Sequence, residues 1–325
     1  MTAITKVGET AIVNVEYFGN EVIDGFIASR HCSPNTSKTY RNSIRQLLKF
    51  FATKSITTPT TADVDNFINT LRAAKKSDST LRLYSTTMKL FFSYLSKQGI
   101  YRDVAADCAP LKLRKSSTHK KKALTDEQAR KLLSAVKGDS LTARRDRAIC
   151  AICLSCGLRT CEVSRADVAD LSDDGCGGYF MYVQGKGRIQ KDAAVRIAPA
   201  VRKLIDSYLE LRGEVADDEP LFISTSNNVK WTANSYGRRL SEQSVGKMIK
   251  RMMLSVGICD RKVTAHSTRH FAITQALRNG CDLREVSQMA RHASLNITMI
   301  YAHDISLENR KAELSLADVL FGVAC

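Results

Sequence analysis

The segment from His266 to Tyr301 holds the residues whose types and spacing could carry chemistry. His266 and Arg269 lie three residues apart, His292 follows, and Tyr301 comes nine residues after His292. If the segment that begins at His266 is helical, His266 and Arg269 should point the same way. An arginine fork matches phosphate oxygens, an imidazole moves protons near neutral pH, and a tyrosine supplies a nucleophilic oxygen. This combination indicates chemistry on a phosphate.

The charge of the chain favours a polyanionic partner. Its 325 residues carry a formal net charge of +16. A nucleic-acid partner is the simpler explanation of this charge. The alternative is a basic protein that has no special partner. The longest apolar run, Ile149 to Leu158, is too short to span a bilayer, so we expect no membrane association. The first residues do not resemble a signal peptide, which predicts reduced cysteines and a cytoplasmic, nucleoid-associated protein.

The first third of the chain shows the apolar spacing of short helices. After residues 1–17, which have no strong period, helical stripes occur around 22–27 and within 34–51, 61–71 and 79–95. This pattern predicts a bundle of about four helices. An excess of basic over acidic residues on two of them favours a DNA-facing side over an ordinary solvated face. The candidate DNA contacts here are Lys38, Arg41, Arg45 and Arg82.

A strongly basic stretch separates this part from the rest of the chain. Residues 111–123 contain basic side chains and no acid, which is typical of a flexible linker and a domain boundary. Such a tether could follow a phosphate backbone or be a solvated hinge. We assign DNA binding to its basic residues: Lys112, Arg114, Lys115, Lys120, Lys121 and Lys122.

The second half begins with a capping box at Thr125 and Gln128, followed by an apolar helix that ends at Gly157. Cys150, Cys153 and Cys156 have a spacing similar to that of iron–sulfur ligands, but their places on an apolar helix favour buried packing residues. No metal or cofactor is expected.

Further along, two strands and a basic region are predicted. The strands flank the turn Gly185-Lys186-Gly187, which puts Lys186 at the tip of a hairpin. A helix follows from Val201 to Arg212. Between Asn227 and His270, nine lysines and arginines stand against two acids, as expected of a DNA-binding surface. We select Arg238, Arg239 and Lys247 there as DNA-binding candidates.

The order of these motifs resembles the tyrosine recombinase (phage integrase) family. The residues that carry the resemblance are Arg159 in a Gly-Leu-Arg context, Glu162, Lys186, the His266–Arg269 box, His292 and Tyr301. The resemblance covers residues 33–303. Two departures stand out: Ala290-Arg291-His292 replaces the frequent Leu-Gly-His, and Thr160-Cys161 follows the first arginine. The first departure puts the local turn in doubt but not the histidine.

The resemblance implies a mainly α fold with a small antiparallel β-sheet in the catalytic domain. It implies an N-terminal extension at 1–17 and a SAM-like, DNA-binding helical domain at 18–110. After the linker at 111–123 come an α+β catalytic domain at 124–305 and a C-terminal tail at 306–325. The tail should contact a neighbouring subunit, with packing on its own domain as the alternative.

The chemistry assigns a role to each motif residue. Tyr301 attacks the phosphodiester, Arg159 and Arg269 hold its oxygens, and His266 is the expected base. Lys186 protonates the departing 5′ oxygen, and His292 donates a hydrogen bond to the phosphate. Glu162 orients its neighbours. We expect His270 to be a packing residue and assign no chemistry to His303.

The expected function is site-specific DNA recombination through a 3′-phosphotyrosyl intermediate and a Holliday junction. The biological role stays open among integration or excision of a mobile element, dimer resolution and inversion. Type IB topoisomerase activity and a catalytically inactive DNA-binding protein are the alternatives. The expected partners are double-stranded DNA with a short inverted-repeat core site, a homotetramer on synapsed sites, and an accessory protein. The absence of a large arm-binding domain from the sequence predicts an Xer-like or simple integrase.

Overall fold

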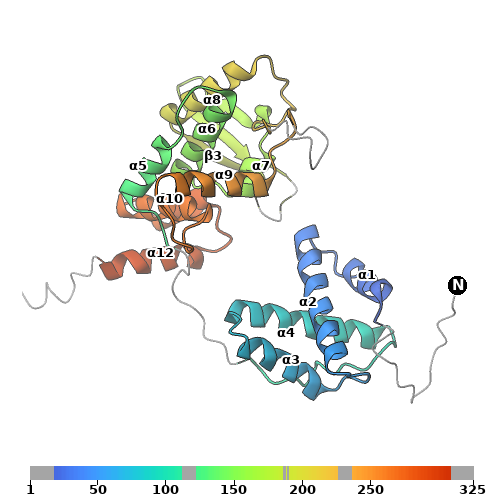
Figure 1. The fold of residues 1–325 in the computed structure, drawn as a ribbon. Helices are drawn as coiled ribbons and strands as arrows, with labels where there is room; N and C mark the ends of the chain where they lie inside the picture. Colours follow the sequence, from blue (N-terminus) through green and yellow to red (C-terminus); the bar gives the residue numbers. More distant parts are fainter. Residues whose placement is uncertain (1–17, 112–121, 186–187, 189, 226–235, 309–325) are drawn as a thin grey trace, which may run out of the picture. The chain divides into compact units, whose positions relative to one another are not determined.

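The computed structural model describes residues 18–111, 122–185, 188, 190–225 and 236–308 (Figure 1). The chain divides into two compact units, Met1–Lys115 and Ser116–Cys325, and each has its own hydrophobic core. The described part is mostly helical with one small antiparallel sheet, as predicted. The detailed domain boundaries, the N-terminal extension and the tail stay predictions, because residues 1–17 and 309–325 lie outside the described residues.

The N-terminal unit contains the short helices expected from the apolar stripes. They are α1 (Asn20–Ala28), α2 (Pro34–Thr53), α3 (Thr61–Ala73) and α4 (Asp78–Lys97) (Figure 1). Ser33 caps α2 by accepting a hydrogen bond from the Thr36 backbone N–H, which satisfies one of the unpaired donors of the first turn. The apolar stripe of α2 is buried in a core rich in phenylalanine. The helical prediction is therefore confirmed for this unit.

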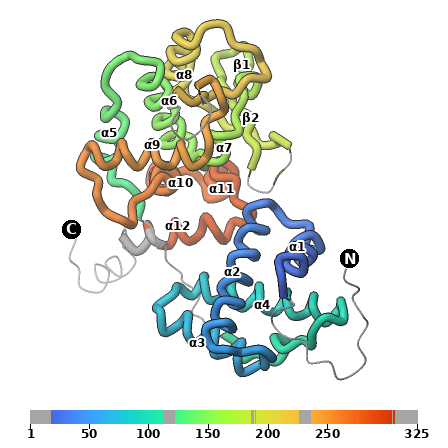
Figure 2. The backbone as a smooth tube through the Cα atoms, turned by 45° about the vertical axis from the view of Figure 1, so that its right-hand side comes forward, coloured from blue at the N-terminus to red at the C-terminus, as the bar shows by residue number. Residues whose placement is uncertain are grey.

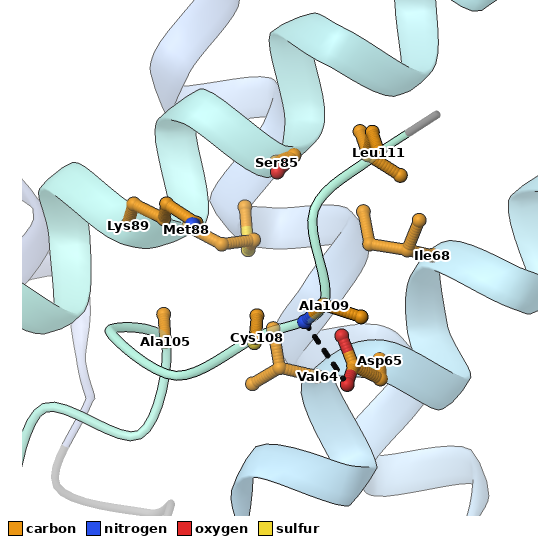
Figure 3. Close-up of a pocket in the computed structure, with 10 residues that line it drawn as sticks. All are labelled: Val64, Asp65, Ile68, Ser85, Met88, Lys89, Ala105, Cys108, Ala109 and Leu111. Carbon is orange, nitrogen blue, oxygen red and sulfur yellow. Dashed lines mark hydrogen bonds between the residues drawn. The ribbon is translucent and has the colours of Figure 1, made fainter. Parts of the chain in front are cut away.

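The segment after α4 is packed back onto α3 and α4. Residues 105–111 run along a small pocket whose other walls come from these two helices (Figure 3). The Ala109 backbone N–H donates to the Asp65 carboxylate at 3.5 Å, and the Tyr101 hydroxyl donates to the Pro59 carbonyl at 2.8 Å. Burial, together with Asp65, raises the pKa of the Cys108 thiol to about 11. The chain is thus held on this unit as far as Leu111.

The second unit begins with helices that surround α6. The order is α5 (Asp126–Ser134), α6 (Leu141–Ser155), α7 (Thr160–Arg165), a 3-10 turn (Val168–Asp170), α8 (Pro199–Arg212), α9 (Glu242–Ser255), α10 (His266–Arg278), α11 (Leu283–Ala290) and α12 (Leu295–Glu308). The predicted capping box is present: the Thr125 hydroxyl accepts from the Gln128 N–H at 3.2 Å, and Gln128 accepts in return from the Thr125 N–H at 3.1 Å.

The cysteines of α6 belong to the core, as predicted. Cys150, Cys153 and Cys156 are at most 3% exposed, and burial raises the pKa of each thiol. Within the described ranges, no group of three or more His, Cys, Asp or Glu residues is placed to hold a metal ion. Helix α6 packs against α8 on one side and α10 on another, so it forms the centre of the unit (Figure 2).

The sheet has the order β1-β2-β3, with β1 (Leu171–Asp173), β2 (Tyr179–Val183) and β3 (Ala193–Ile197) all antiparallel. Met181 pairs with Val195, and these side chains are buried while their neighbours along the strands are more exposed. The β2–β3 hairpin is therefore confirmed, with the alternation of a half-buried sheet. Strand β1 was not predicted, because its length of three residues is too short for a visible period.

Among the described helices, none combines the length and the apolar character needed to cross a membrane.

Candidate active site

The turn between α6 and α7 places Arg159 and Glu162. Gly157 has a φ of +60°, and a Cβ there would lie 3.3 Å from the Ala272 Cβ, so glycine allows the turn to approach α10. Arg159 is the N-cap of α7, and its backbone N–H donates to the Glu162 carboxylate at 2.8 Å. The Arg159 guanidinium donates to the same carboxylate at 2.7 Å. Glu162, which is fully buried, therefore fixes both the backbone and the side chain of Arg159.

Arg269 on α10 lies almost completely inside the unit, with 1% of its surface exposed. Its Nη1 donates to the Gly157 carbonyl at 2.6 Å, and its Nη2 donates to the Ala290 carbonyl. Burial and the nearby charges of Arg159 and Arg291 lower the pKa of Arg269 to about 9. The group still carries its charge at neutral pH, and it joins α10 to the α6–α7 turn and to the end of α11.

Arg291 is a site residue that the sequence reasoning treated only as a departure in a turn. Its Nη2 and Nε donate to the two Glu162 carboxylate oxygens at 2.6 and 3.2 Å. Its Nη1 donates to the Met289 carbonyl at 2.5 Å. The signal that could have found it was present in the sequence, because a basic residue directly precedes a predicted catalytic histidine.

Tyr301 lies on α12 among imidazole rings. Its ring centroid is 5.2 Å from that of His270 and 6.0 Å from that of His292, whose plane is nearly parallel to the tyrosine ring. The His292 Nδ1 shares a hydrogen bond of 2.8 Å with the buried Thr298 hydroxyl, which fixes the orientation of the ring. Burial raises the pKa of Tyr301 to about 12, although the charges of Arg269 and Arg159 oppose this rise. The phenol is therefore protonated at neutral pH.

His266 and His270 form a short series of rings that leads to Tyr301. Their centroids are 4.7 Å apart in an edge-to-face arrangement, and His270 lies between the other two rings. His266 is exposed at the first position of α10, whereas Arg269 and His270 are buried. His270 is a packing residue, as expected, but its contact with Tyr301 also places it in the site. The i, i+4 spacing of the two histidines was the available signal.

Lys186 lies outside the described residues, so its predicted role as an acid stays a prediction. The described ends of its hairpin are anchored to the unit. Arg165 donates to the Gly185 carbonyl at 3.3 Å, and the Lys191 ammonium donates to the Asp167 and Asp170 carboxylates at 2.6 and 2.5 Å.

The DNA-binding candidates fall into three groups. Lys112, Arg114, Lys115, Lys120 and Lys121 lie outside the described residues. The exposed candidates are Lys38, Arg45, Arg82, Arg238 and Lys247. The others have acidic partners: Arg41 pairs with Asp24, Lys122 lies 3.6 Å from Asp260, and Arg239 pairs with Asp167.

Arg239 makes several contacts within its own unit. Besides its pair with Asp167, its guanidinium donates to the backbone carbonyls of Ser164 and Ala166 at 3.2 and 3.0 Å. These bonds join the segment before α9 to the end of α7. The side chain therefore bonds within its own unit, and because it is 38% exposed, its DNA-binding role stays a prediction.

The site as a whole carries an excess of positive charge beside a potential nucleophile. Arg159, Arg269 and Arg291 contribute three cations and Glu162 one anion, which leaves a net charge of two (3 − 1). Attack on a phosphodiester places about two negative charges on the non-bridging oxygens, and preorganised cations stabilise such a transition state. The fold and the site therefore have the features expected of an enzyme that acts on phosphodiesters through a tyrosine.

Comparison with known proteins identifies the family. The model of the phage integrase family matches residues 122–307, and that of the phage integrase N-terminal SAM-like domain matches residues 23–99. The chain belongs to the phage integrase family and is a tyrosine recombinase that cleaves and rejoins DNA.

The similar proteins include Xer recombinases. Tyrosine recombinase XerC of Thermodesulfovibrio yellowstonii is 26% identical, with 90% of this chain and 93% of the relative covered. Tyrosine recombinase XerD of Listeria monocytogenes is 26% identical over 87% of this chain and 94% of the relative. The crystal structure of XerH recombinase with a palindromic difH substrate, a post-cleavage complex, shares the fold. Its TM-score is 0.66 at 20% identity, over 91% of this chain and 83% of that one.

Proposed function

We propose that this protein recombines DNA at a specific site by forming a 3′-phosphotyrosyl bond through Tyr301. The observation that carries the proposal is the position of the buried Tyr301 phenol beside His270, His292 and the cationic group formed by Arg159 and Arg269. A phenol with a pKa near 12 is a poor nucleophile at neutral pH and needs a proton acceptor. In this proposal an imidazole is the acceptor, and the arginines are the cations that the developing charge requires.

The proposed reaction exchanges one phosphoester bond for another. The Tyr301 oxygen attacks phosphorus and gives its proton to an imidazole. Our candidate for this acceptor is His266, and the His270 ring lies between His266 and Tyr301. The bond from phosphorus to the 5′ oxygen breaks, and Lys186 supplies the proton that produces a free 5′ hydroxyl. Because the phosphotyrosyl ester conserves the bond energy, a 5′ hydroxyl from another strand can reverse the step without a nucleotide cofactor.

The proposed substrate is double-stranded DNA with a short inverted-repeat core site. The formal net charge of +16 and the exposed basic residues on α2, α4 and α9 support a phosphate-rich partner. A λ integrase structure with 16% identity and a TM-score of 0.64 is described as a tetramer bound to a Holliday junction. We propose the same assembly here, acting at the nucleoid in the cytoplasm. An accessory protein that directs the outcome is part of this proposal.

The biological role we propose is that of a simple recombinase, either in dimer resolution or in integration and excision of a mobile element. The similarity to the Xer tyrosine recombinases supports a simple recombinase of this family. A structure described as the Tn1549 transposon integrase with circular intermediate DNA shares the fold, with a TM-score of 0.62 at 16% identity, and this supports a role in integration and excision.

Covalent capture tests the proposed function. The purified protein is incubated with a library of nicked suicide duplexes, in which the departing strand diffuses away, and the trapped DNA is sequenced. We expect capture of duplexes that share one inverted-repeat motif, and complete loss of capture in Tyr301→Phe. Tyr182→Phe is the matched control, because that tyrosine is exposed on β2 and should capture DNA as the unaltered protein does.

Capture through another residue, or equal capture by Tyr301→Phe, would disprove the assignment of the nucleophile. Relaxation of supercoiled plasmid with no sequence requirement would instead indicate topoisomerase activity.

A further inference from the structure

Arg291 occupies the residue position that ends α11 and directly precedes His292. Its φ of 52° and ψ of 48° lie in the left-handed region. The His292 N–H donates to the Ser287 carbonyl at 3.0 Å, and the Arg291 N–H donates to the Gln288 carbonyl at 2.9 Å. These two bonds form a Schellman motif, in which the left-handed residue is most often glycine. The arginine therefore stands at a backbone position that disfavours a side chain.

The side chain of Arg291 is engaged at this unfavourable position rather than directed to solvent. It is 9% exposed, and its fork meets the fully buried Glu162 carboxylate with one nitrogen on each oxygen, at 2.6 and 3.2 Å. Burial raises the pKa of Glu162, but the bonds and charges of Arg291 and Arg159 outweigh that effect, and the pKa is lowered overall. Bidentate pairs of this kind fix geometry as well as charge.

Arg291 also contacts Arg159 through its main chain. The Arg159 Nη2 donates to the Arg291 carbonyl at 3.3 Å, while the Arg159 Nη1 donates to Glu162. The guanidinium of Arg159 is thus held at one nitrogen by Arg291 and at the other by the carboxylate that Arg291 pairs with. Arg159 is also the more accessible of the two, with 23% of its side chain exposed against 9% for Arg291.

This geometry solves a problem that substrate binding would create. A phosphate that recruits the Arg159 donors would remove part of the hydrogen bonding of Glu162, and an unpaired buried carboxylate is costly. With Arg291 as a second cation, Glu162 keeps a bidentate partner while it still orients Arg159, some of whose donors turn to the phosphate.

We propose that Arg291 is a positioning residue, which holds Glu162 permanently and thereby keeps Arg159 oriented towards, and free to bind, the scissile phosphate. This proposal rests on the proposed function, since it requires a phosphodiester substrate at Arg159. It adds a residue that acts through Glu162 and Arg159 without touching the substrate itself.

The test compares Arg291→Gly and Arg291→Lys with the unaltered protein on a duplex that the latter has captured. Glycine removes the fork and suits the left-handed backbone, so the turn should be retained. Lysine keeps the charge but not the bidentate geometry. Arg284→Ala is the control, because it removes an equal charge from an exposed position of the same helix. Single-turnover cleavage is measured with saturating enzyme, and the Kd is measured in the non-cleaving Tyr301→Phe background.

We expect Arg291→Gly to cleave about 10- to 100-fold more slowly, with a Kd within about twofold, because misplacement of a catalytic group costs rate rather than binding. The cleavage rate of Arg291→Lys should lie between those of Arg291→Gly and the unaltered protein. The cleavage rate of Arg284→Ala should match that of the unaltered protein. In a Glu162→Gln background, Arg291→Gly should cause little further loss, because both changes interrupt the same connection.

A second substrate separates positioning from general damage to the fold. A methylphosphonate at the scissile position has one methyl group in place of a charged oxygen, so it depends less on Arg159. The ratio of rates between the unaltered protein and Arg291→Gly should therefore shrink towards one on this substrate. If Arg291→Gly does not fold, the same comparison is made with Arg291→Lys.

Equal losses on both substrates, or cleavage by Arg291→Gly and Arg291→Lys at the rate of the unaltered protein, would overturn the proposal. Those results leave the proposed function intact, provided that the unaltered protein still forms its Tyr301 adduct. Failure of the unaltered protein to capture any duplex would count against the proposed function instead.

Discussion

Burial and reactivity oppose each other at Tyr301. The side chain is 5% exposed, and removal from water raises its pKa to about 12, which favours the neutral phenol. Arg269 and Arg159 act in the other direction, because a phenolate beside two cations is stabilised. At neutral pH the phenol holds its proton, so the reaction needs a group that removes it. In our proposal His266 is that group, and the His270 ring lies between it and Tyr301.

Removal of the proposed base should therefore change the pH profile. Below its pKa, the phenolate fraction of Tyr301 increases about tenfold for each pH unit, because ionisation follows the proton concentration. In His266→Ala we expect slower cleavage at pH 7 that rises with nearly this slope up to pH 8, which is below the pKa of about 9 of Arg269. The unaltered protein should rise less, since its base already accepts the proton.

Single-turnover cleavage across this pH range checks the expectation. His303→Ala serves as the control because His303 is exposed and has no assigned chemistry. A flat profile for His266→Ala, at the rate of the unaltered protein, would show that His266 is not the base.

At the scale of helices and strands, the sequence predicted those features that are encoded locally. Capping residues and apolar spacing identified α2 and α5, and the alternation around the Gly185 turn identified the hairpin. The resemblance to a known family also brought distant motif residues together in one site, but two further side chains that join it through contacts between distant segments were missed. Arg291 becomes a site residue only because α7 and α11 meet, which brings it to Glu162 over a separation of 129 residues. His270 becomes one only because α12 packs on α10.

The β2–β3 hairpin depends on an ion-pair network at its base. Lys191, which follows the hairpin tip, bonds the carboxylates of Asp167 and Asp170, and Arg239 also pairs with Asp167. Asp170 is buried, so it depends on this partner more than a surface carboxylate would. The network joins the arm of the hairpin that follows Lys186 to the 3-10 turn.

Lys191→Met should loosen the hairpin and slow cleavage. It leaves Asp170 without its cation, so we expect faster amide hydrogen exchange in β3 and a severalfold loss of single-turnover cleavage. The loss should be much smaller in a Lys186→Ala background, because both changes act on the same proposed proton donor. Arg188→Ala removes a cation from an exposed pair with Asp192 in the same loop and should have little effect. Unchanged exchange in β3 would contradict the anchoring role.

The net charge of the whole molecule overstates the surface available to DNA. Some cations serve internal contacts: Arg145 pairs with Asp146 and bonds the Ile223 carbonyl, and Arg269 is enclosed between carbonyl groups. Others, such as Arg45 on α2 and Arg82 on α4, are exposed. Composition counts both kinds equally, so only the structure separates cations that hold the fold from cations that can meet phosphate.

This distinction predicts different outcomes for two arginine substitutions made in the non-cleaving Tyr301→Phe background. Each phosphate contact releases condensed counterions, so the logarithm of the binding constant falls linearly with the logarithm of the salt concentration. Arg45→Ala should weaken binding at low salt and reduce the steepness of that line by about one, while the thermal unfolding midpoint stays the same. Arg239→Ala should instead lower the unfolding midpoint, because its bonds to Asp167 and to the Ser164 and Ala166 carbonyls are lost.

Titrations by fluorescence anisotropy at several salt concentrations, together with calorimetric melting, distinguish the two outcomes. The salt line should keep its slope in Arg239→Ala, since no phosphate contact is removed. An unchanged slope in Arg45→Ala, or a reduced slope with an unchanged midpoint in Arg239→Ala, would reverse the assignment of these residues. The first of these results would mean that α2 does not present Arg45 to the DNA backbone. The second would mean that Arg239 leaves Asp167 and binds the DNA backbone.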